Sequence, residues 1–144
     1  MLTKPSLLLR AAIGKTIGLI FGFIAFFILP QIVPDLSLLF RWGLVFYLTM
    51  MGGFIGIMGV MTYHPVLHMP MPWWVRGPLI GGFMMLVLWM LAQTEFDAVA
   101  TAIFGEGSLF SSGAWSIVDG MVIGAIMSFL ATRFGGEGKE TVGR

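Results

Sequence analysis

The stretch that decides the fold is residues 11–29, AAIGKTIGLIFGFIAFFIL, in which Lys15 is the only charged residue. A helix rises 1.5 Å per residue, so about 20 mainly apolar residues cross a hydrocarbon core of about 30 Å. The stretch is therefore predicted to span a membrane and to end at Pro30. Because three further stretches have the same character, the sequence predicts an all-α, polytopic membrane protein, a bundle of four transmembrane helices over about residues 11–29, 36–63, 73–93 and 115–132. Residues 1–134 are expected to form a single transmembrane domain, followed by a polar cytoplasmic tail over residues 135–144.

The composition also favours a membrane protein. The chain has 144 residues, of which 58% are hydrophobic and 10% charged, whereas about a quarter of a soluble domain is charged. Disorder requires low hydrophobicity and high net charge, and nucleic-acid binding requires a basic face, so the net charge of +1 argues against both. The absence of cysteine excludes disulfides and thiolate metal sites. We expect the lipid bilayer as a partner, and no nucleic acid.

The distribution of basic residues predicts the orientation in the membrane. Lys and Arg are enriched in cytoplasmic segments. With the N-terminus inside, only Arg41 falls on the outer side, and the cytoplasmic side receives Lys4, Arg10, Lys15, Arg76, Arg133, Lys139 and Arg144. We therefore expect a multi-pass membrane protein with both termini in the cytoplasm, and a bacterial inner membrane as its location.

The connection between the third and fourth spans contains a helical pattern of its own. Its apolar residues recur at helical spacing, and Thr94 followed by Asp97 resembles a capping pattern. These apolar residues are Phe96, Val99, Ala100, Ile103 and Phe104. The pattern predicts a short amphipathic helix at the membrane interface, ended by Gly105 and Gly107. A lid at the level of the lipid headgroups is the first interpretation, and a gating or docking role is the second.

A glycine string, G-x-x-I-G, occurs once in each predicted span. Two glycines four positions apart lie on one helix face and let two backbones approach closely. Packing within one chain is the first interpretation, while a shared use in an oligomer and an ancient duplication stay open. The second span also has Gly53 and Gly59 on a nearly bare face, open to a neighbouring helix or to a flat lipid, quinone or pigment. The candidate packing residues are Gly14, Gly18, Gly22, Gly52, Gly56, Gly77, Gly81, Gly120 and Gly124.

Three charged residues fall within the predicted spans: Lys15, Arg41 and Asp119. A charge in hydrocarbon is costly and is frequently functional. Lys15 and Arg41 lie near span ends, so their long stems can carry the charge to the headgroups. Asp119 is short and lies about one turn inside the outer boundary. Pairing with Arg41, a role in ion or proton passage, and hydration from the outer loop all stay open for it.

Both histidines of the chain lie in residues 63–74, YHPVLHMPMPWW. Imidazole nitrogen and thioether sulfur suit Cu(I), so His64 and His68 are candidate ligands for copper or haem. The prolines in this stretch break any helix, however, and do not ensure that both rings face one metal. The first interpretation is therefore an interfacial loop without a cofactor.

The sequence contains none of the enzyme motifs H-E-x-x-H, G-x-S-x-G or G-x-x-x-x-G-K-[ST]. We expect a non-enzymatic membrane protein that acts through helix–helix association, either as an accessory or stabilising subunit of a larger membrane complex or as a homo-oligomeric scaffold. One alternative is a small homo-oligomeric ion channel or transporter with Asp119 in its path. A third is a membrane subunit that binds haem or copper through His64 and His68.

Overall fold

The computed structural model describes residues 4–143, so Arg144 lies outside the described residues. The described chain contains five α-helices: α1 (Leu7–Ile32), α2 (Leu38–Ile57), α3 (Trp73–Leu91), α4 (Gln93–Phe104) and α5 (Ser116–Gly135). All of them except α4 are long and apolar enough to cross a membrane. The predicted four-span bundle, with a short helix between the third and fourth spans, is confirmed.

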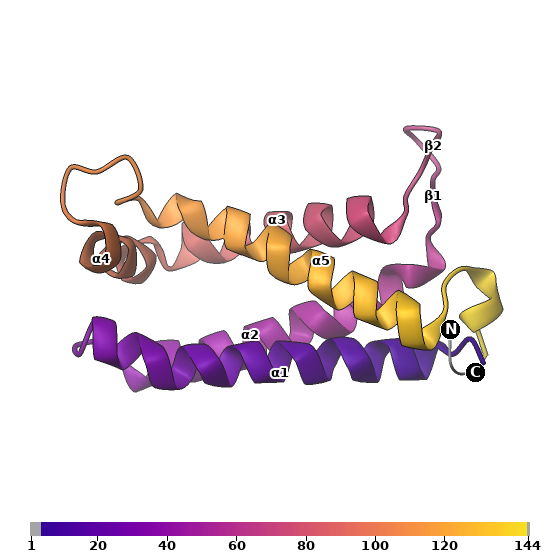
Figure 1. Ribbon diagram of the computed structural model, residues 1–144, viewed down its shortest axis with the longest axis horizontal. Helices are drawn as coiled ribbons and strands as arrows, with labels where there is room; N and C mark the ends of the chain where they lie inside the picture. Colours follow the sequence, from indigo (N-terminus) through magenta and orange to yellow (C-terminus); the bar gives the residue numbers. More distant parts are fainter. Residues whose placement is uncertain (1–3, 144) are drawn as a thin grey trace.

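Short elements complete the connections between the helices. Three 3-10 turns, η1 (Met58–Val60), η2 (Gly113–Trp115) and η3 (Lys139–Thr141), follow α2, precede α5 and follow α5. Between α2 and α3, strand β1 (Tyr63–His64) pairs antiparallel with β2 (Met69–Pro70). This hairpin projects sideways from the bundle (Figure 1).

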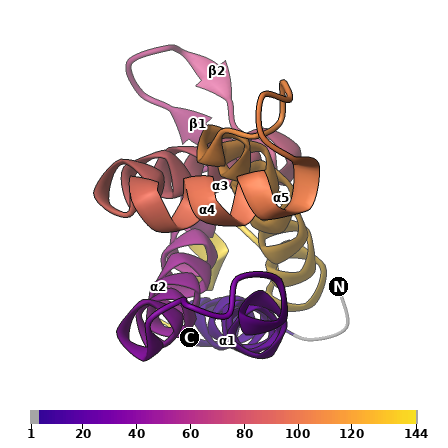
Figure 2. The same ribbon diagram turned by 90° about the vertical axis from the view of Figure 1, so that its left-hand side faces the viewer.

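The four spans form two pairs, α1 with α2 and α3 with α5, and the pairs diverge along their length (Figure 1). We call the two ends of the bundle the arginine end, which contains Arg10 and Arg76, and the α4 end. The pairs meet at the arginine end, where the Ser6 N–H donates to the Gly135 carbonyl oxygen at 2.9 Å. At the opposite end α4 lies across the spans (Figure 2).

Glycines set the close approach within each pair. A Cβ on Gly14 would overlap the backbone of Gly52, and a Cβ on Gly18 would overlap that of Leu48. In the other pair, Gly77 faces the backbone of Gly124, and Gly81 faces that of Gly120. These contacts bring backbone against backbone, which gives tight van der Waals packing where the hydrophobic effect contributes little. The remaining candidates, Gly22 and Gly56, lie against Val45 and Arg10.

The nearly bare glycine face of α2 is filled from α1. The side chain of Lys15 lies over Gly53, and the Arg10 guanidinium lies over Gly59. This face is therefore covered by the chain itself and offers no open surface to a neighbouring helix or a flat ligand. Lys15 itself is exposed.

The predicted end of the first span at Pro30 is wrong, because α1 continues through Pro30 to Ile32. Proline has no N–H, so the Phe26 carbonyl oxygen, four residues earlier, loses its helical donor. Arg41 replaces that donor: its Nε and Nη2 donate to the Phe26 oxygen at 3.0 and 2.7 Å. A side chain from α2 thus allows α1 to pass a residue that breaks many helices.

Two other predicted boundaries also differ. The α-helix of the second span ends at Ile57 rather than near Tyr63, because the glycine-rich segment tightens into the 3-10 turn η1. Helix α4 begins at Gln93, so Thr94 does not cap it. The carboxylate of Asp97 instead accepts from the Gly113 N–H at 2.6 Å and from the Trp89 indole N–H at 3.4 Å. Asp97 therefore fastens α4 to the segments on either side of it.

Candidate functional site

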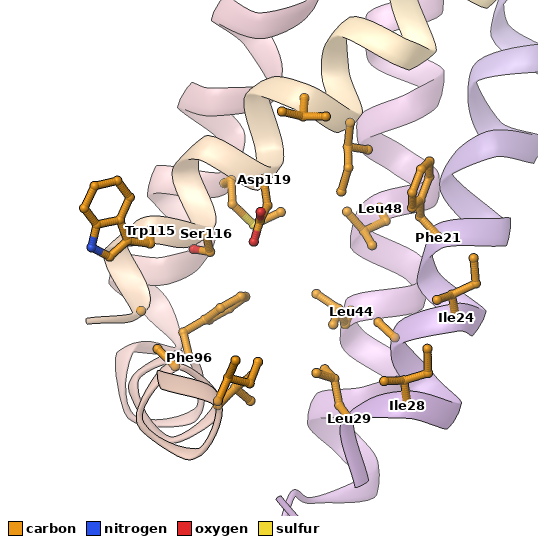
Figure 3. Close-up of a pocket in the computed structure, with 18 of the residues that line it drawn as sticks. Phe21, Ile24, Ile28, Leu29, Leu44, Leu48, Phe96, Trp115, Ser116 and Asp119 are labelled. Carbon is orange, nitrogen blue, oxygen red and sulfur yellow. The ribbon is translucent and has the colours of Figure 1, made fainter. Parts of the chain in front are cut away.

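A cavity of about 490 Å³ lies between the two helix pairs, near the α4 end. Figure 3 shows its two sides, with Ser116 and Asp119 of α5 facing Leu44 and Leu48 of α2. Helix α1 contributes Phe21 and aliphatic residues, and α4 lies across the end. The lining is almost wholly apolar, so the few polar groups stand out.

The polar groups share one face of α5 because of their spacing. Residues three or four positions apart lie on the same face of a helix, and this places Ser116, Asp119 and Ile123 together along the cavity. Asp119 is in the first turn of α5, where the positive end of the helix dipole favours a negative charge. The spacing on α5 thus places the Asp119 carboxylate and the Ser116 hydroxyl at the wall of an apolar cavity.

These two groups have no partners within the described chain. The Asp119 side chain is exposed and lines the cavity, and its carboxylate forms no hydrogen bond or ion pair with any residue of 4–143. The Ser116 hydroxyl is buried, and it too lacks a hydrogen-bond partner among those residues. Polar groups away from water are normally satisfied, so this wall of the cavity has unused acceptor capacity.

The sequence also suggested a pairing of Asp119 with Arg41, and the structure does not form it. The Arg41 guanidinium donates to the Phe26 carbonyl oxygen and lies 4.1 Å from the centroid of the Phe26 ring. The physical reason is the donor that Pro30 lacks, because it leaves an acceptor within reach of Arg41. Asp119 therefore faces the cavity without a basic partner.

His64 and His68 lie in the hairpin, where the His68 N–H donates to the His64 carbonyl oxygen at 3.0 Å. The Nδ1 atom of His64 accepts from the N–H groups of Val66 and Leu67, at 3.2 and 3.0 Å. This ring nitrogen is used by the turn, which explains why a histidine suits the position without a metal. Residues 4–143 contain no group of three or more potential metal ligands among His, Cys, Asp and Glu.

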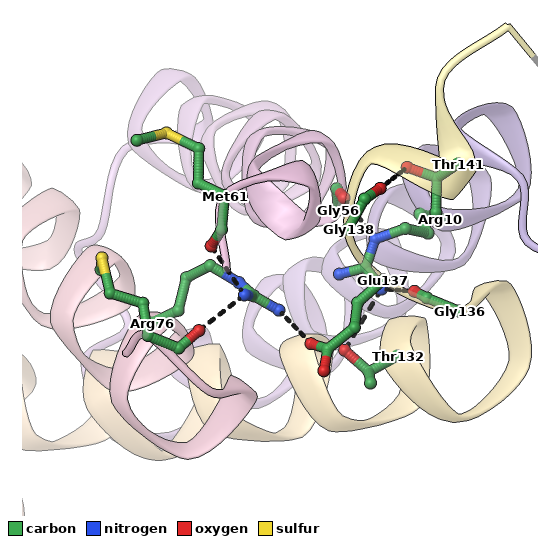
Figure 4. A network of polar contacts seen from close by, with 10 residues as sticks. Arg10, Gly56, Met61, Arg76, Thr132, Gly136, Glu137, Gly138 and Thr141 are labelled. Atoms are coloured by element: carbon green, nitrogen blue, oxygen red, sulfur yellow. Dashed lines mark hydrogen bonds and ion pairs between the residues drawn. The ribbon is translucent and has the colours of Figure 1, made fainter. Parts of the chain in front are cut away.

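The arginine end contains a polar network that was not predicted from the sequence. Arg10 is fully buried; its Nε donates to the Gly56 carbonyl oxygen at 2.8 Å, and its Nη1 donates to the Thr132 hydroxyl at 3.2 Å and to the Gly136 carbonyl oxygen (Figure 4). Gly56 and Gly136 lie at the C-terminal ends of α2 and α5, where carbonyl groups lack helical donors. One guanidinium therefore caps two helices and joins the two pairs.

Arg76 completes this network from the start of α3. It is fully buried, and its Nη1 donates to the carbonyl oxygens of Met61 and Met71 at 2.9 and 2.8 Å. Its Nη2 forms an ion pair with Glu137 at 3.1 Å (Figure 4). Arg76 thereby connects both ends of the hairpin segment to Glu137, two residues after the end of α5.

The distribution of charge predicts only that Arg10 and Arg76 lie on the cytoplasmic side, and it does not predict that both side chains are buried. The expected polar tail also packs onto the bundle: the Gly138 N–H donates to the Gly59 carbonyl oxygen at 2.8 Å, and Thr141 is fully buried. One sequence signal was available for Arg10, because Gly59 and Gly135 leave room for its side chain. No such signal indicated the ion pair of Arg76 with Glu137, which lies 61 residues further along the chain.

Comparisons with known proteins add no family to this geometry. The chain matches no protein-family model, no curated protein and no solved structure at a significant level. The four candidate spans identify a multi-pass integral membrane protein. Its function has to be argued from the cavity and from the polar groups that face it.

Proposed function

We propose that this integral membrane protein is a non-catalytic binding protein, which holds a lipophilic molecule in the cavity between its two helix pairs. The cavity is the observation that carries the proposal. Its volume of about 490 Å³ falls within the range of about 300–1,000 Å³ that is typical of small-molecule sites. An apolar lining at membrane depth suits a ligand that partitions from the lipid.

The arrangement of the helices supports a lasting cavity rather than a gap that closes. Within each pair the backbones are already in contact at glycines, so the helices of a pair cannot slide closer. The pairs are fixed to each other at the arginine end by Arg10. At the other end Asp97 holds α4 in place. The space between the pairs follows from these three constraints.

Trp115 provides a direct test, because it is among the residues at the cavity wall and the other four tryptophans are not. The variant that retains only Trp115 is placed in phosphatidylcholine bilayers and titrated with C16 alcohol or C16 amine, each dibrominated at carbons 9 and 10. We expect the bromine atoms to quench Trp115 fluorescence saturably, because a bound chain fills a finite site. Ala25→Phe, which fills part of the cavity, is expected to remove the saturable component.

The matched control retains only Trp74, which is exposed at the opposite end of the bundle. Its quenching is expected to rise in proportion to the probe in the bilayer, without saturation. If Trp115 behaves in the same way with both probes, no chain is bound in the cavity and the proposal is wrong.

A role as an accessory or stabilising subunit of a larger membrane complex, or as a homo-oligomeric scaffold, is a second candidate. The hairpin favours it, because this hairpin projects beyond the bundle and exposes 76% of Val66 and 62% of Leu67 (Figure 1). Apolar side chains in this position suit contact with a neighbouring chain at the membrane surface. A homo-oligomeric channel with Asp119 in its path is less favoured. Asp119 faces the cavity inside one bundle, and Arg10 and Arg76 fill the arginine end of that bundle. Haem or copper binding gains no support from the hairpin.

The subunit hypothesis predicts a cross-link at the tip of the hairpin. The chain has no cysteine, so Leu67→Cys provides a single reactive site. We expect a bifunctional thiol reagent, applied to native membranes, to join it to another chain, while Leu8→Cys, which is also exposed, stays unlinked. A different partner in fixed ratio supports the subunit, and a multiple of 15.8 kDa supports the scaffold. A monomer at both positions argues against both.

A further inference from the structure

We infer that the molecule bound in the cavity is an amphiphile with a protonated amine head, held by the Asp119 carboxylate and the Ser116 hydroxyl. This inference rests on the proposed function and adds the chemistry of the ligand. It makes α5 the recognition helix of the site, and it leaves the remaining walls to contact the apolar part of the molecule.

The first argument is the missing donor at Asp119. Acidic side chains inside a membrane are normally paired, and the basic side chain nearest in expected depth, Arg41, is engaged by Phe26. No basic residue contributes to the cavity wall. A bound cation would supply the partner that the described chain lacks.

The second argument is that the indole N–H groups of two nearby tryptophans already donate to other acceptors. The Trp115 indole N–H donates to the Leu109 carbonyl oxygen at 2.9 Å. The Trp89 indole N–H donates to Asp97 instead of reaching into the cavity. The site therefore offers acceptors at Asp119 and Ser116 without a competing side-chain donor from these two tryptophans.

The third argument is the geometry of the head that fits. A primary ammonium has three N–H donors, so it can serve a carboxylate and a hydroxyl one helical turn apart. The ring of Phe96, which points into the cavity (Figure 3), adds an aromatic face that attracts a cation. A carboxylate or phosphate head would meet the negative charge of Asp119, and an ester has no donor to offer.

Three probes with the same dibrominated C16 chain test this inference: an amine, an alcohol and a carboxylate. They are titrated into the protein that retains only Trp115, in phosphatidylcholine bilayers, and each affinity is corrected for partitioning into protein-free vesicles. A hydrogen bond between two charged groups is stronger than one with a neutral donor, so we expect the amine to bind about tenfold or more tightly than the alcohol. The carboxylate is expected to bind most weakly.

Asp119→Asn isolates the charge with almost no change of shape. We expect it to remove the preference for the amine over the alcohol, while saturable quenching by both probes reports that the cavity is intact. The matched control is Glu106→Gln, because Glu106 is an exposed acid in the loop after α4 and outside the cavity. This control is expected to keep the full preference.

The possible results separate this inference from the proposed function. Saturable quenching of equal strength by all three probes overturns the amine head and leaves the lipophile site in place. An amine preference that survives in Asp119→Asn also overturns the inference, because the attraction then lies elsewhere. Quenching without saturation by every probe overturns the proposed function itself.

Discussion

Gly18→Ala is expected to lower the free energy of unfolding by about 3 kcal/mol, although it adds only one methyl group. A Cβ at this position would overlap the Leu48 carbonyl oxygen and lie 2.9 Å from the Thr49 Cα atom. Both atoms belong to the backbone of α2, so neither can rotate away, and α1 has to separate from α2. Overpacking of a tight interface costs about 1–3 kcal/mol, and a displaced helix also loses neighbouring contacts.

Gly43→Ala provides a matched control within α2. Nothing lies within 4 Å of a Cβ built there, so the added methyl group meets no other helix. Alanine favours a helix by about 1 kcal/mol over glycine, and the variant is expected to be as stable as the parent or slightly more stable. Thermal unfolding followed by circular dichroism in mild detergent measures both variants. Equal losses at the two sites would mean that the close approach of α1 and α2 does not determine stability.

Arg10→Met is expected to have a comparable effect, a loss of about 3–5 kcal/mol. Each buried acceptor that loses its donor costs about 1–3 kcal/mol, and Arg10 serves three acceptors. The acceptors that lose the guanidinium are the carbonyl oxygens of Gly56 and Gly136 and the Thr132 hydroxyl. Arg10→Lys is expected to rescue little, because an ammonium lacks the planar fork that reaches several acceptors.

Arg133→Met is the control for Arg10, since Arg133 is a basic residue of the same region that is exposed. Its effect is expected to stay within about 0.5 kcal/mol. Hydrogen exchange at the Gly138 N–H, which donates to Gly59, gives a second measurement. It is expected to accelerate in Arg10→Met alone. If the two variants lose equal stability and Gly138 exchanges at the parent rate in both, Arg10 does not join the ends of α2 and α5.

The spans could be predicted from the sequence because hydrophobic length is a local property. Residues 11–29 identify a membrane helix without reference to any other part of the chain. The choice of helix partners is different. The same G-x-x-I-G string occurs in every span, so the string alone cannot tell that Gly14 meets Gly52 while Gly77 meets Gly124. That choice depends on the connections and on the polar network.

The roles of the arginines could not be derived from the distribution of charge. The rule that predicts orientation uses only the number of basic residues in each segment, and this number contains no information about the contacts of each side chain. Arg41 donates to the carbonyl oxygen of Phe26, which is 15 residues away in the sequence. This oxygen is free because Pro30 has no N–H to donate to it. Arg76 meets Glu137, which is 61 residues away. Contacts of this kind follow from the tertiary structure.

Only one part of the cavity could be predicted from the sequence, namely the face of α5 that lines it. The spacing of Ser116, Asp119 and Ile123 on one helix face is visible in the sequence. The empty space in front of them is not, because it depends on the divergence of the two helix pairs (Figure 1). The sequence could therefore identify Asp119 as a residue of interest without showing what it faces.

The long reach of Arg10 has a consequence for biosynthesis. Its side-chain partner Thr132 lies 122 residues further along the chain, and its backbone acceptor at Gly136 lies 126 residues further. A nascent α1 enters the bilayer with a guanidinium whose acceptors on α5 have not yet been translated. Until the segment around Gly136 has been translated, Arg10 has only the Gly56 carbonyl oxygen of α2 as an acceptor. The contacts that join Arg10 to Thr132 and Gly136 can therefore form only after all four spans have been translated.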